Sequence, residues 1–193
     1  MARTAGRSAS DTRRAVFEAA STVFRTRGMA ATLDDVAHEA GLSKGGVIYH
    51  FPTKDDLMSA LAQSLLEDFR EAVHGRIDPS DELPGRLTRA YVRASLAEAE
   101  LRTAHETYAL ITQLITSPAV AEVAREDASR WRRDLADDGL PSDVTSLVVA
   151  AADGANASPL WGGGVDSAEN ERLADQLIAL TLDPAGWARA VAP

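Results

Sequence analysis

Helix caps and helix breakers recur at short intervals in the first third of the chain, and this punctuation restricts that stretch to helices joined by tight turns. The first helix is predicted from Asp11 or Thr12 to Gly28, with apolar residues at the 3.6-residue period between its ends. A second helix begins at Thr32, because Asp35 follows three residues later at the spacing of a capping box.

Two further helices follow at once. Gly41 ends the second helix, and Ser43 caps a very short third one. The third helix ends before Pro52, because the residue before a proline leaves helical geometry. Thr53 and Asp56 repeat the capping-box spacing and start a fourth helix.

The rest of the chain also has helical signals and no segment that alternates like a strand, so the predicted fold is all-α. The further helices are expected over residues 82–99, 103–116, 119–137, 142–157 and 169–182. The chain has no cysteine, which excludes disulfides, and no apolar run of the length that spans a bilayer. The amino terminus lacks the apolar segment of a secretory signal, so a cytoplasmic protein is expected.

Charge is divided unevenly along the 193 residues, whose formal net charge is -9. Residues 1–50 hold seven Arg and Lys against five Asp and Glu, a net of +2, whereas residues 51–193 have a net of -11. The acidic segment 51–193 does not attract nucleic acid, so only residues 1–50 are suited to binding it.

The second and third predicted helices, with a Gly-Leu turn between them, match a helix-turn-helix, in which the second of the two helices lies in the DNA major groove. Ser43 and Lys44 supply donors at its start, and Gly45 and Gly46 allow close approach to phosphates. Tyr49 and His50 place polar groups at the carboxyl end of the third helix, and Lys54 places an ammonium group at the start of the fourth. The alternative is that these are merely polar residues on a short surface helix, since a three-helix unit with a turn is common in all-α proteins.

The stretch TLDDVAHEAGLSKGGVIYHFPTKDDLMSAL, residues 32–61, resembles the DNA-binding domain of TetR-family (tetracycline-repressor-like) transcriptional regulators, and the match extends back to about residue 12. The resemblance implies an all-α homodimer that a small molecule releases from operator DNA. It implies a helix-turn-helix domain over residues 1–54 and a larger helical ligand-binding and dimerisation domain over residues 55–193. We expect residues 1–10, with their arginines, to form a flexible arm that enters the minor groove or stays in solution.

The resemblance also assigns roles to individual residues. Thr32, Ser43, Tyr49 and His50 correspond to backbone-phosphate contacts, Lys44, Gly45 and Gly46 to the base-facing start of the recognition helix, and Lys54 to a phosphate clamp. The chain departs from the family where a frequent tyrosine is Ile48, which is expected to pack inward. Because two glycines remove side chains that read bases, specificity is expected to depend on Lys44, Val47 and DNA shape.

For the larger domain the predictions concern a dimer interface and a ligand cavity. Small and apolar residues at 142–158 and 169–182 fit a four-helix dimer interface, which the resemblance implies; in a monomer they would be core. The interface candidates are Val144, Leu147, Val148, Ala151, Ala155, Leu173, Leu177 and Leu180. The residues expected to line a ligand cavity are Tyr91, His105, Tyr108, Gln113, Trp131 and Trp161.

Catalytic and cofactor motifs are absent from the sequence. The four histidines lack metal-ligand spacing, the WGGG loop at 161–164 lacks the lysine of a phosphate-binding loop, and no Gly-x-Ser-x-Gly elbow occurs. We therefore expect no enzyme, cofactor or metal, and we expect double-stranded operator DNA, a second copy of the chain and a small effector as partners. A ligand-independent DNA-binding regulator is the alternative, and an enzyme is a remote one.

Overall fold

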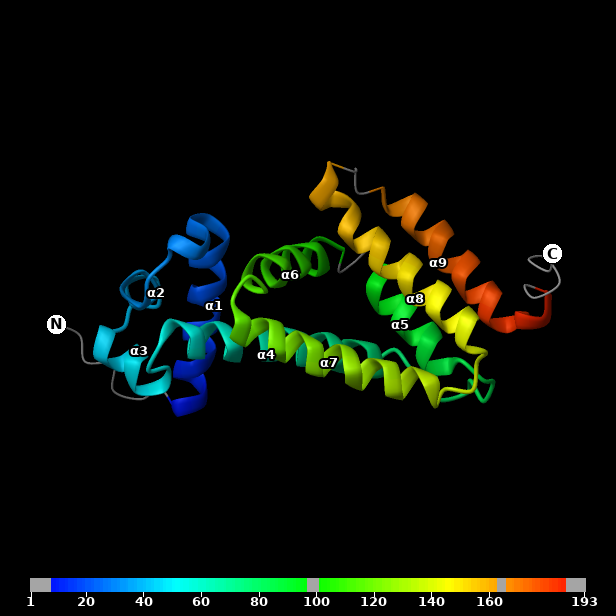
Figure 1. Cartoon of the computed structure of the whole chain (residues 1–193), viewed down its shortest axis with the longest axis horizontal. Coiled ribbons are helices and arrows are strands. Elements are labelled where there is room, and N and C mark those ends of the chain that lie inside the picture. Colours follow the sequence, from blue (N-terminus) through cyan, green and yellow to red (C-terminus); the bar gives the residue numbers. More distant parts are fainter. Residues whose placement is uncertain (1–7, 97–100, 163–165, 187–193) are drawn as a thin grey trace. The chain divides into compact units, whose positions relative to one another are not determined.

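The computed structural model describes residues 8–96, 101–162 and 166–186, with the backbone alone for residues 101–105, and all regular structure in these ranges is helical (Figure 1). The elements are α1 (Ala9–Arg27), the 3₁₀ turn η1 (Gly28–Ala30), α2 (Leu33–Glu39), α3 (Lys44–His50), α4 (Lys54–His74), α5 (Arg86–Leu96), α6 (Leu101–Leu114), α7 (Pro118–Ala136), α8 (Ser142–Ala157), the 3₁₀ turn η3 (Ser158–Trp161) and α9 (Ser167–Leu182). The all-α prediction is confirmed.

The predicted helix starts are confirmed at α2 and α3 and wrong at α1. Thr32 and Ser43 cap α2 and α3 with their side-chain oxygens. The cap of α1 is Ser8, which forms a capping box with Asp11, so the helix begins before the predicted residues Asp11 or Thr12. Residues 8–10 consequently belong to a capped helix, and residues 1–7 of the expected arm lie outside the described part.

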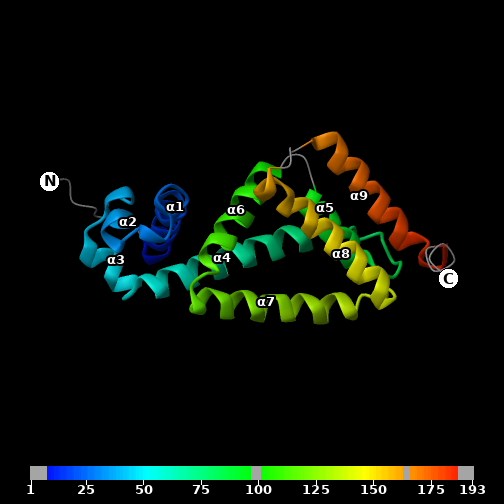
Figure 2. The same ribbon diagram turned by 45° about the horizontal axis from the view of Figure 1, so that its top comes forward.

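The chain divides into two compact units, one made of residues up to Ser64 with Leu110–Ala124, and one made of Leu65–Ala109 with the residues from Arg125 onward. In the first unit, α1, α2 and α3 adjoin one another (Figure 2), and apolar side chains from each fill a common interior. Its fully buried large side chains include Val16, Phe24, Val36, Val47, Phe51 and Leu57.

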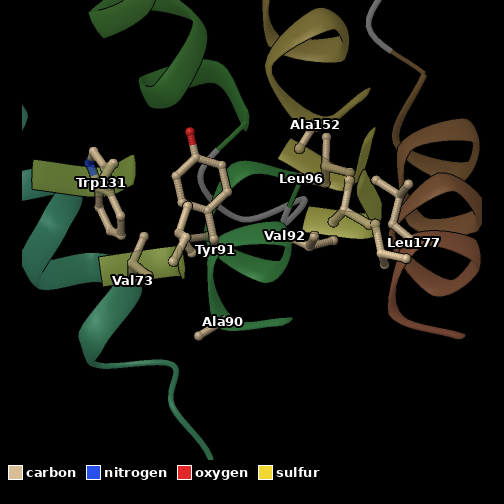
Figure 3. Packing of buried hydrophobic residues seen from close by; sticks show 12 residues of the cluster. Val73, Ala90, Tyr91, Val92, Leu96, Trp131, Ala152 and Leu177 are labelled. Atoms are coloured by element: carbon tan, nitrogen blue, oxygen red, sulfur yellow. The ribbon is translucent and has the colours of Figure 1, made fainter. Parts of the chain in front are cut away.

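In the second unit, α5 packs against both α8 and α9, and apolar residues of α4 and α7 complete the core. Figure 3 shows Tyr91 beside Trp131 on one side of α5, and Val92 and Leu96 toward Ala152 and Leu177 on the other. Because α5 is surrounded in this way, most of its side chains are buried.

Two arginines of the second unit are buried in polar networks. Arg89, 1% exposed, donates to both carboxylate oxygens of Asp81 at 2.7 and 2.8 Å and to the hydroxyl of Thr181 at 3.2 Å. Arg70 donates to Asp134 at 2.5 Å, and its guanidinium lies 4.0 Å from the ring centroid of Trp131. These contacts join segments far apart in the sequence.

The first turn of α5 is capped by a carboxylate that follows α7. Asp138 accepts the backbone N–H of Leu87 at 3.0 Å, and the N–H and hydroxyl of Thr88 at 2.7 and 2.8 Å. These bonds satisfy amide groups that a helix start leaves without partners.

Candidate nucleic-acid interface

The turn between α2 and α3 depends on a glycine in the left-handed region. Gly41 has a φ of 66°, its N–H donates to the carbonyl of His38 at 3.1 Å, and the N–H of Leu42 donates to the carbonyl of Ala37 at 2.9 Å. This pair of bonds is a Schellman motif, which favours a residue without a Cβ at the left-handed position. The motif fixes the direction in which the chain leaves α2 toward α3.

Helix α3 has one buried side and one exposed side. Val47 is 0% exposed, so the prediction that it contacts bases is wrong: its position on the helix faces the core. The prediction for Ile48 is wrong in the opposite sense, because its side chain is 37% exposed. Lys44, Gly45 and Ile48 share the exposed side, together with Tyr49, which is 84% exposed.

The first turn of α3 presents a lysine and a capping serine. Lys44 forms an ion pair with Asp34 at 2.8 Å, in which both side chains are more than half exposed. Such a pair contributes only about 0–1 kcal/mol, so an approaching phosphate or base edge can replace Asp34. Ser43 accepts the N–H of Gly46 at 3.1 Å through its Oγ, and its own hydroxyl hydrogen can still be donated.

The two adjacent glycines of α3 have different surroundings. A Cβ on Gly46 would lie 3.3 Å from the Oγ of Ser43, so a side chain there would crowd the cap. A Cβ on Gly45 would meet no atom within 4 Å. Contacts within the chain explain a glycine at 46 and do not explain one at 45, where close approach of another molecule would.

The far end of α3 carries two neighbouring rings. Tyr49 and His50 meet edge to face with ring centroids 5.2 Å apart, and Tyr49 is the more exposed of the two. Both rings therefore stand beside the end of α3, where the phosphate contacts are predicted.

Two predicted phosphate-binding residues have partners inside the first unit. The N–H and hydroxyl of Thr32 both donate to Asp35, at 2.9 and 2.8 Å. The hydrogen bond from the Thr32 hydroxyl, followed by that from its N–H, lowers the pKa of the Asp35 carboxyl. Lys54 donates to the carbonyl of Met29 at 2.5 Å. Both residues thus stabilise the unit itself, in addition to any contact with DNA.

Arg13 of α1 lies beside the end of α3, a position that was not predicted from the sequence. Its guanidinium lies 5.0 Å from the ring centroid of Phe17 and 4.8 Å from that of Phe51, the residue after α3. The neighbouring Arg14 instead pairs with Asp11 at 3.5 Å. The spacing of Arg13 and Phe17, four residues apart on one helix, is the signal in the sequence that points to this stacking.

Two of the predicted cavity residues lie together in the second unit. Tyr91 and Trp131 pack edge to face with centroids 5.1 Å apart, next to Phe69 of α4. The hydroxyl of Tyr91 donates to Asp153 of α8 at 2.7 Å. Burial, followed by the charge of Asp153, raises the pKa of the Tyr91 phenol, so the phenol keeps its proton.

The other four predicted cavity residues differ in their surroundings, and Tyr108 is among the groups whose charge affects the pKa of Tyr91. Trp161 is 85% exposed, so the prediction that it lines a cavity within the chain is wrong. Tyr108 is 36% exposed. Gln113 belongs to the first unit, and the side chain of His105 lies outside the described part.

The predicted dimer-interface residues fall on different sides of their helices. Val144, Val148 and Leu177 are at most 6% exposed and lie in the core around α5, so the prediction that they face a second copy is wrong. Leu147 is 38% exposed. The remaining candidates, Ala151, Ala155, Leu173 and Leu180, are partly buried against that core. Leu147, Ala151 and Ala155 follow one another at four-residue steps and define a second stripe on α8.

Among the residues that the structure describes, no group of three or more His, Asp or Glu side chains could hold a metal ion. None of the described helices is both long and apolar enough for a bilayer crossing.

Two family models match the chain. The model described as bacterial regulatory proteins of the tetR family covers residues 16–61, and the tetracyclin repressor-like C-terminal domain covers residues 85–182. The second match alone spans half of the chain.

Three similar proteins agree with these matches. The HTH-type transcriptional regulator TtgR of Pseudomonas putida is 41% identical over 68 residues, which are 35% of this chain and only 32% of TtgR. The HTH-type transcriptional repressor KstR2 of Rhodococcus jostii is 26% identical over 87% of this chain and 88% of its own. The crystal structure of multidrug binding protein EbrR complexed with malachite green has 28% identity and a TM-score of 0.67, over 88% of this chain and 97% of EbrR.

Both halves of the chain thus match the same group of proteins, which are transcriptional regulators and not enzymes. The chain belongs to the TetR family of transcriptional regulators.

Proposed function

We propose that this regulator is a repressor that binds a palindromic operator as a homodimer in the cytoplasm and is released by a small molecule. In this proposal residues 1–54 form the DNA-binding domain, and residues 55–193 bind the effector and form the dimer. The observation that carries the proposal is the division of α3 into a buried side at Val47 and an exposed side at Lys44, Gly45 and Tyr49.

The exposed side of α3 has the chemistry of a recognition helix. Lys44 can exchange its exposed partner Asp34 for a phosphate or a guanine edge, and Gly45 permits close approach of the DNA backbone. Tyr49 and His50 add donors at the other end of the helix. Arg13 extends these contacts, since its stacked guanidinium is held by two rings and retains its N–H donors for a phosphate.

A homodimer is supported by geometry and by the small size of α3. One seven-residue helix offers few base contacts, whereas two helices about 34–36 Å apart reach successive major grooves on one face of the duplex. We assign the interface to the α8 stripe of Leu147, Ala151 and Ala155 with Leu173 and Leu180 of α9.

Effector binding is supported by the aromatic group of Phe69, Tyr91 and Trp131, which has a hydrogen-bonding carboxyl, Asp153, at its edge. Apolar walls with a few polar groups are typical of small-molecule sites. EbrR, the structural relative, binds malachite green. The close packing of the same aromatic rings favours the alternative, a regulator that binds DNA without an effector.

The test is selection of bound DNA from a random pool, followed by sedimentation and titration. We expect an inverted repeat as the selected site and a dimer at micromolar concentration. An effector from a thermal-shift screen should bind more weakly when operator is present, by the same factor by which it weakens operator binding, because the coupling is reciprocal. A monomer with undiminished DNA binding would refute the dimer, and equal effector affinity in both titrations would leave the ligand-independent alternative.

A further inference from the structure

Ile48 is an apolar residue on the side of α3 to which we assign DNA contact. It is 37% exposed, whereas its neighbour Val47 is 0% exposed and belongs to the core of the first unit. By the 3.6-residue period of the helix, Gly45 and Tyr49 lie opposite Val47. Around the helix axis, Ile48 lies between Lys44 and Gly45. It therefore adjoins the two residues that begin the recognition helix.

The stability of α3 does not explain an isoleucine at this position. Isoleucine is β-branched and loses side-chain freedom in a helix, so alanine or a long polar residue suits an exposed helical position better. The seven residues of α3 already include two glycines, which are poor helix formers. Single exposed apolar residues are common on protein surfaces, so what distinguishes Ile48 is its position beside Lys44 and Gly45.

Gly45 allows the short side chain of Ile48 to reach the floor of a DNA groove. A Cβ at position 45 would meet no atom of the chain within 4 Å, so the surface of α3 is open there. Residues three positions apart on a helix are neighbours, so DNA that approaches the backbone at Gly45 also comes close to Ile48. An isoleucine side chain is much shorter than that of lysine and touches a base only where the helix itself lies close to the DNA.

The major groove offers an isoleucine one kind of apolar partner. Guanine, cytosine and adenine present hydrogen-bond donors and acceptors there, whereas thymine also presents its C5-methyl group. An isoleucine placed over the polar groups would remove their water without replacing the hydrogen bonds, which is unfavourable. Contact with a thymine methyl group carries no such cost. Lys44, four residues before Ile48, supplies the complementary donor for a guanine edge.

We propose that Ile48 is a specificity-determining residue that packs against the C5-methyl group of a thymine in each half of the operator. This inference rests on the proposed function, because it names a base that the recognition helix selects. It gives Ile48 the role in base selection that was predicted for Val47, whose side chain is buried.

The experiment removes the methyl group from the DNA and the side chain from the protein, separately and together. The DNA is the inverted repeat that selection from a random pool returns. Each thymine of a half-site is replaced in turn by deoxyuridine, which lacks the methyl group and keeps the hydrogen-bonding groups. Fluorescence anisotropy then measures the affinity of the full chain for each DNA.

The protein variants are Ile48→Ala, Ile48→Val and a matched control, Ile115→Ala. Ile115 is 42% exposed, directly follows α6 and belongs to the same unit as α3, so its substitution removes the same side chain from a similarly exposed position. Circular dichroism checks that each variant has the helix content and melting behaviour of the parent.

We expect deoxyuridine at one thymine position to weaken binding by the parent about fourfold for each half-site, or about fifteenfold when both halves carry it, as for loss of a buried methyl group from each. Ile115→Ala should show the same ratio of affinities. Ile48→Ala should bind the thymine and deoxyuridine operators equally, and Ile48→Val, whose side chain is shorter by one methylene group, should give a smaller ratio than the parent.

Equal affinity of the parent for thymine and deoxyuridine at every position would overturn the inference. A ratio that Ile48→Ala leaves unchanged would also overturn it, because the methyl group would then act through another side chain or through DNA shape. Both results leave the proposed function standing, since the operator is still bound. A selection that returns no inverted repeat refutes the proposed function, and this inference with it.

Discussion

The capping contacts of the first unit and the buried arginine contacts of the second unit differ in how far they reach along the chain. In the first unit, called here the DNA-binding unit, the hydroxyl groups of Ser8, Thr32 and Thr53 donate to carboxylates three residues away. The side chains involved are exposed. In the second unit, Arg89 and Thr181 are 92 residues apart, and Arg70 and Asp134 are 64 apart. Local contacts define each helix singly, whereas distant contacts hold different helices together.

This difference predicts where substitutions have their largest effect. Asp81→Ala should destabilise the chain by about 3–5 kcal/mol, because it leaves the buried guanidinium of Arg89 without its charged partner. Lys44→Ala removes an exposed pair and should change the free energy of unfolding by at most about 1 kcal/mol. Urea denaturation followed by circular dichroism measures both. Similar destabilisation of the two variants would remove the distinction between the units.

The second prediction concerns two neighbouring arginines of the DNA-binding unit. Arg13→Ala should weaken operator binding by about tenfold for each phosphate that the guanidinium binds. It should also reduce the slope of the logarithm of the binding constant against the logarithm of the salt concentration, by about one for each of these phosphates. Arg14→Ala, which removes a residue paired with Asp11, is the control and should have a smaller effect. Fluorescence anisotropy at several salt concentrations tests this. Arg13→Lys would restore the charge without the planar stacking, so full recovery by lysine would show that stacking is unimportant.

The third prediction concerns the local caps. Thr32→Val should lower the Tm at pH 7 by about 2–4 °C, because α2 loses its cap. Since Thr32 holds the pKa of Asp35 below its ordinary range, the stabilisation is present above that range and is lost as the pH falls through the lowered pKa. The difference in Tm between the two proteins should therefore become smaller in acid, where only the hydrogen bond from the Asp35 N–H to the Thr32 hydroxyl still distinguishes them. A constant difference at every pH would contradict the role of the Asp35 charge.

The smallest effect on stability is expected at Gly45, where it should be a gain. Gly45→Ala should stabilise the chain by about 0.4–1 kcal/mol, since the position is helical and a Cβ there meets nothing. Operator affinity should nevertheless fall, because the methyl group would stand between α3 and the DNA. Gly46→Ala is the comparison, since its Cβ crowds the Oγ of Ser43. Unchanged affinity in Gly45→Ala would show that the backbone at 45 does not approach DNA closely.

The sequence predicted the fold class, the caps of α2 and α3, and most helix ends to within a few residues, because these depend on local signals. It did not predict which side of α3 faces the core. The seven residues of this helix contain too few apolar positions to decide whether Val47 or Ile48 is the buried residue. It also did not predict which side of α8 faces α5. Val144 and Val148 form one apolar stripe and Leu147 and Ala151 another, and only the position of α5 distinguishes them.

The buried clusters around Arg89 and Asp153 were likewise outside the reach of the sequence. Their members come from segments 62 to 92 residues apart, and no periodicity connects such segments. The sequence therefore pointed to Tyr91 as a ligand residue but not to its partner Asp153.

The cap that Asp138 provides for α5 has a consequence for the order of folding during synthesis. The first turn of α5 is made about 50 residues before the carboxylate that satisfies its amide groups. At about 5–20 residues per second, the ribosome needs roughly 3–10 s to supply that residue. Helix α1, whose cap Ser8 immediately precedes it, has no such delay. The DNA-binding unit can thus form its first helix as it emerges, whereas α5 is completed only after α7 has been made.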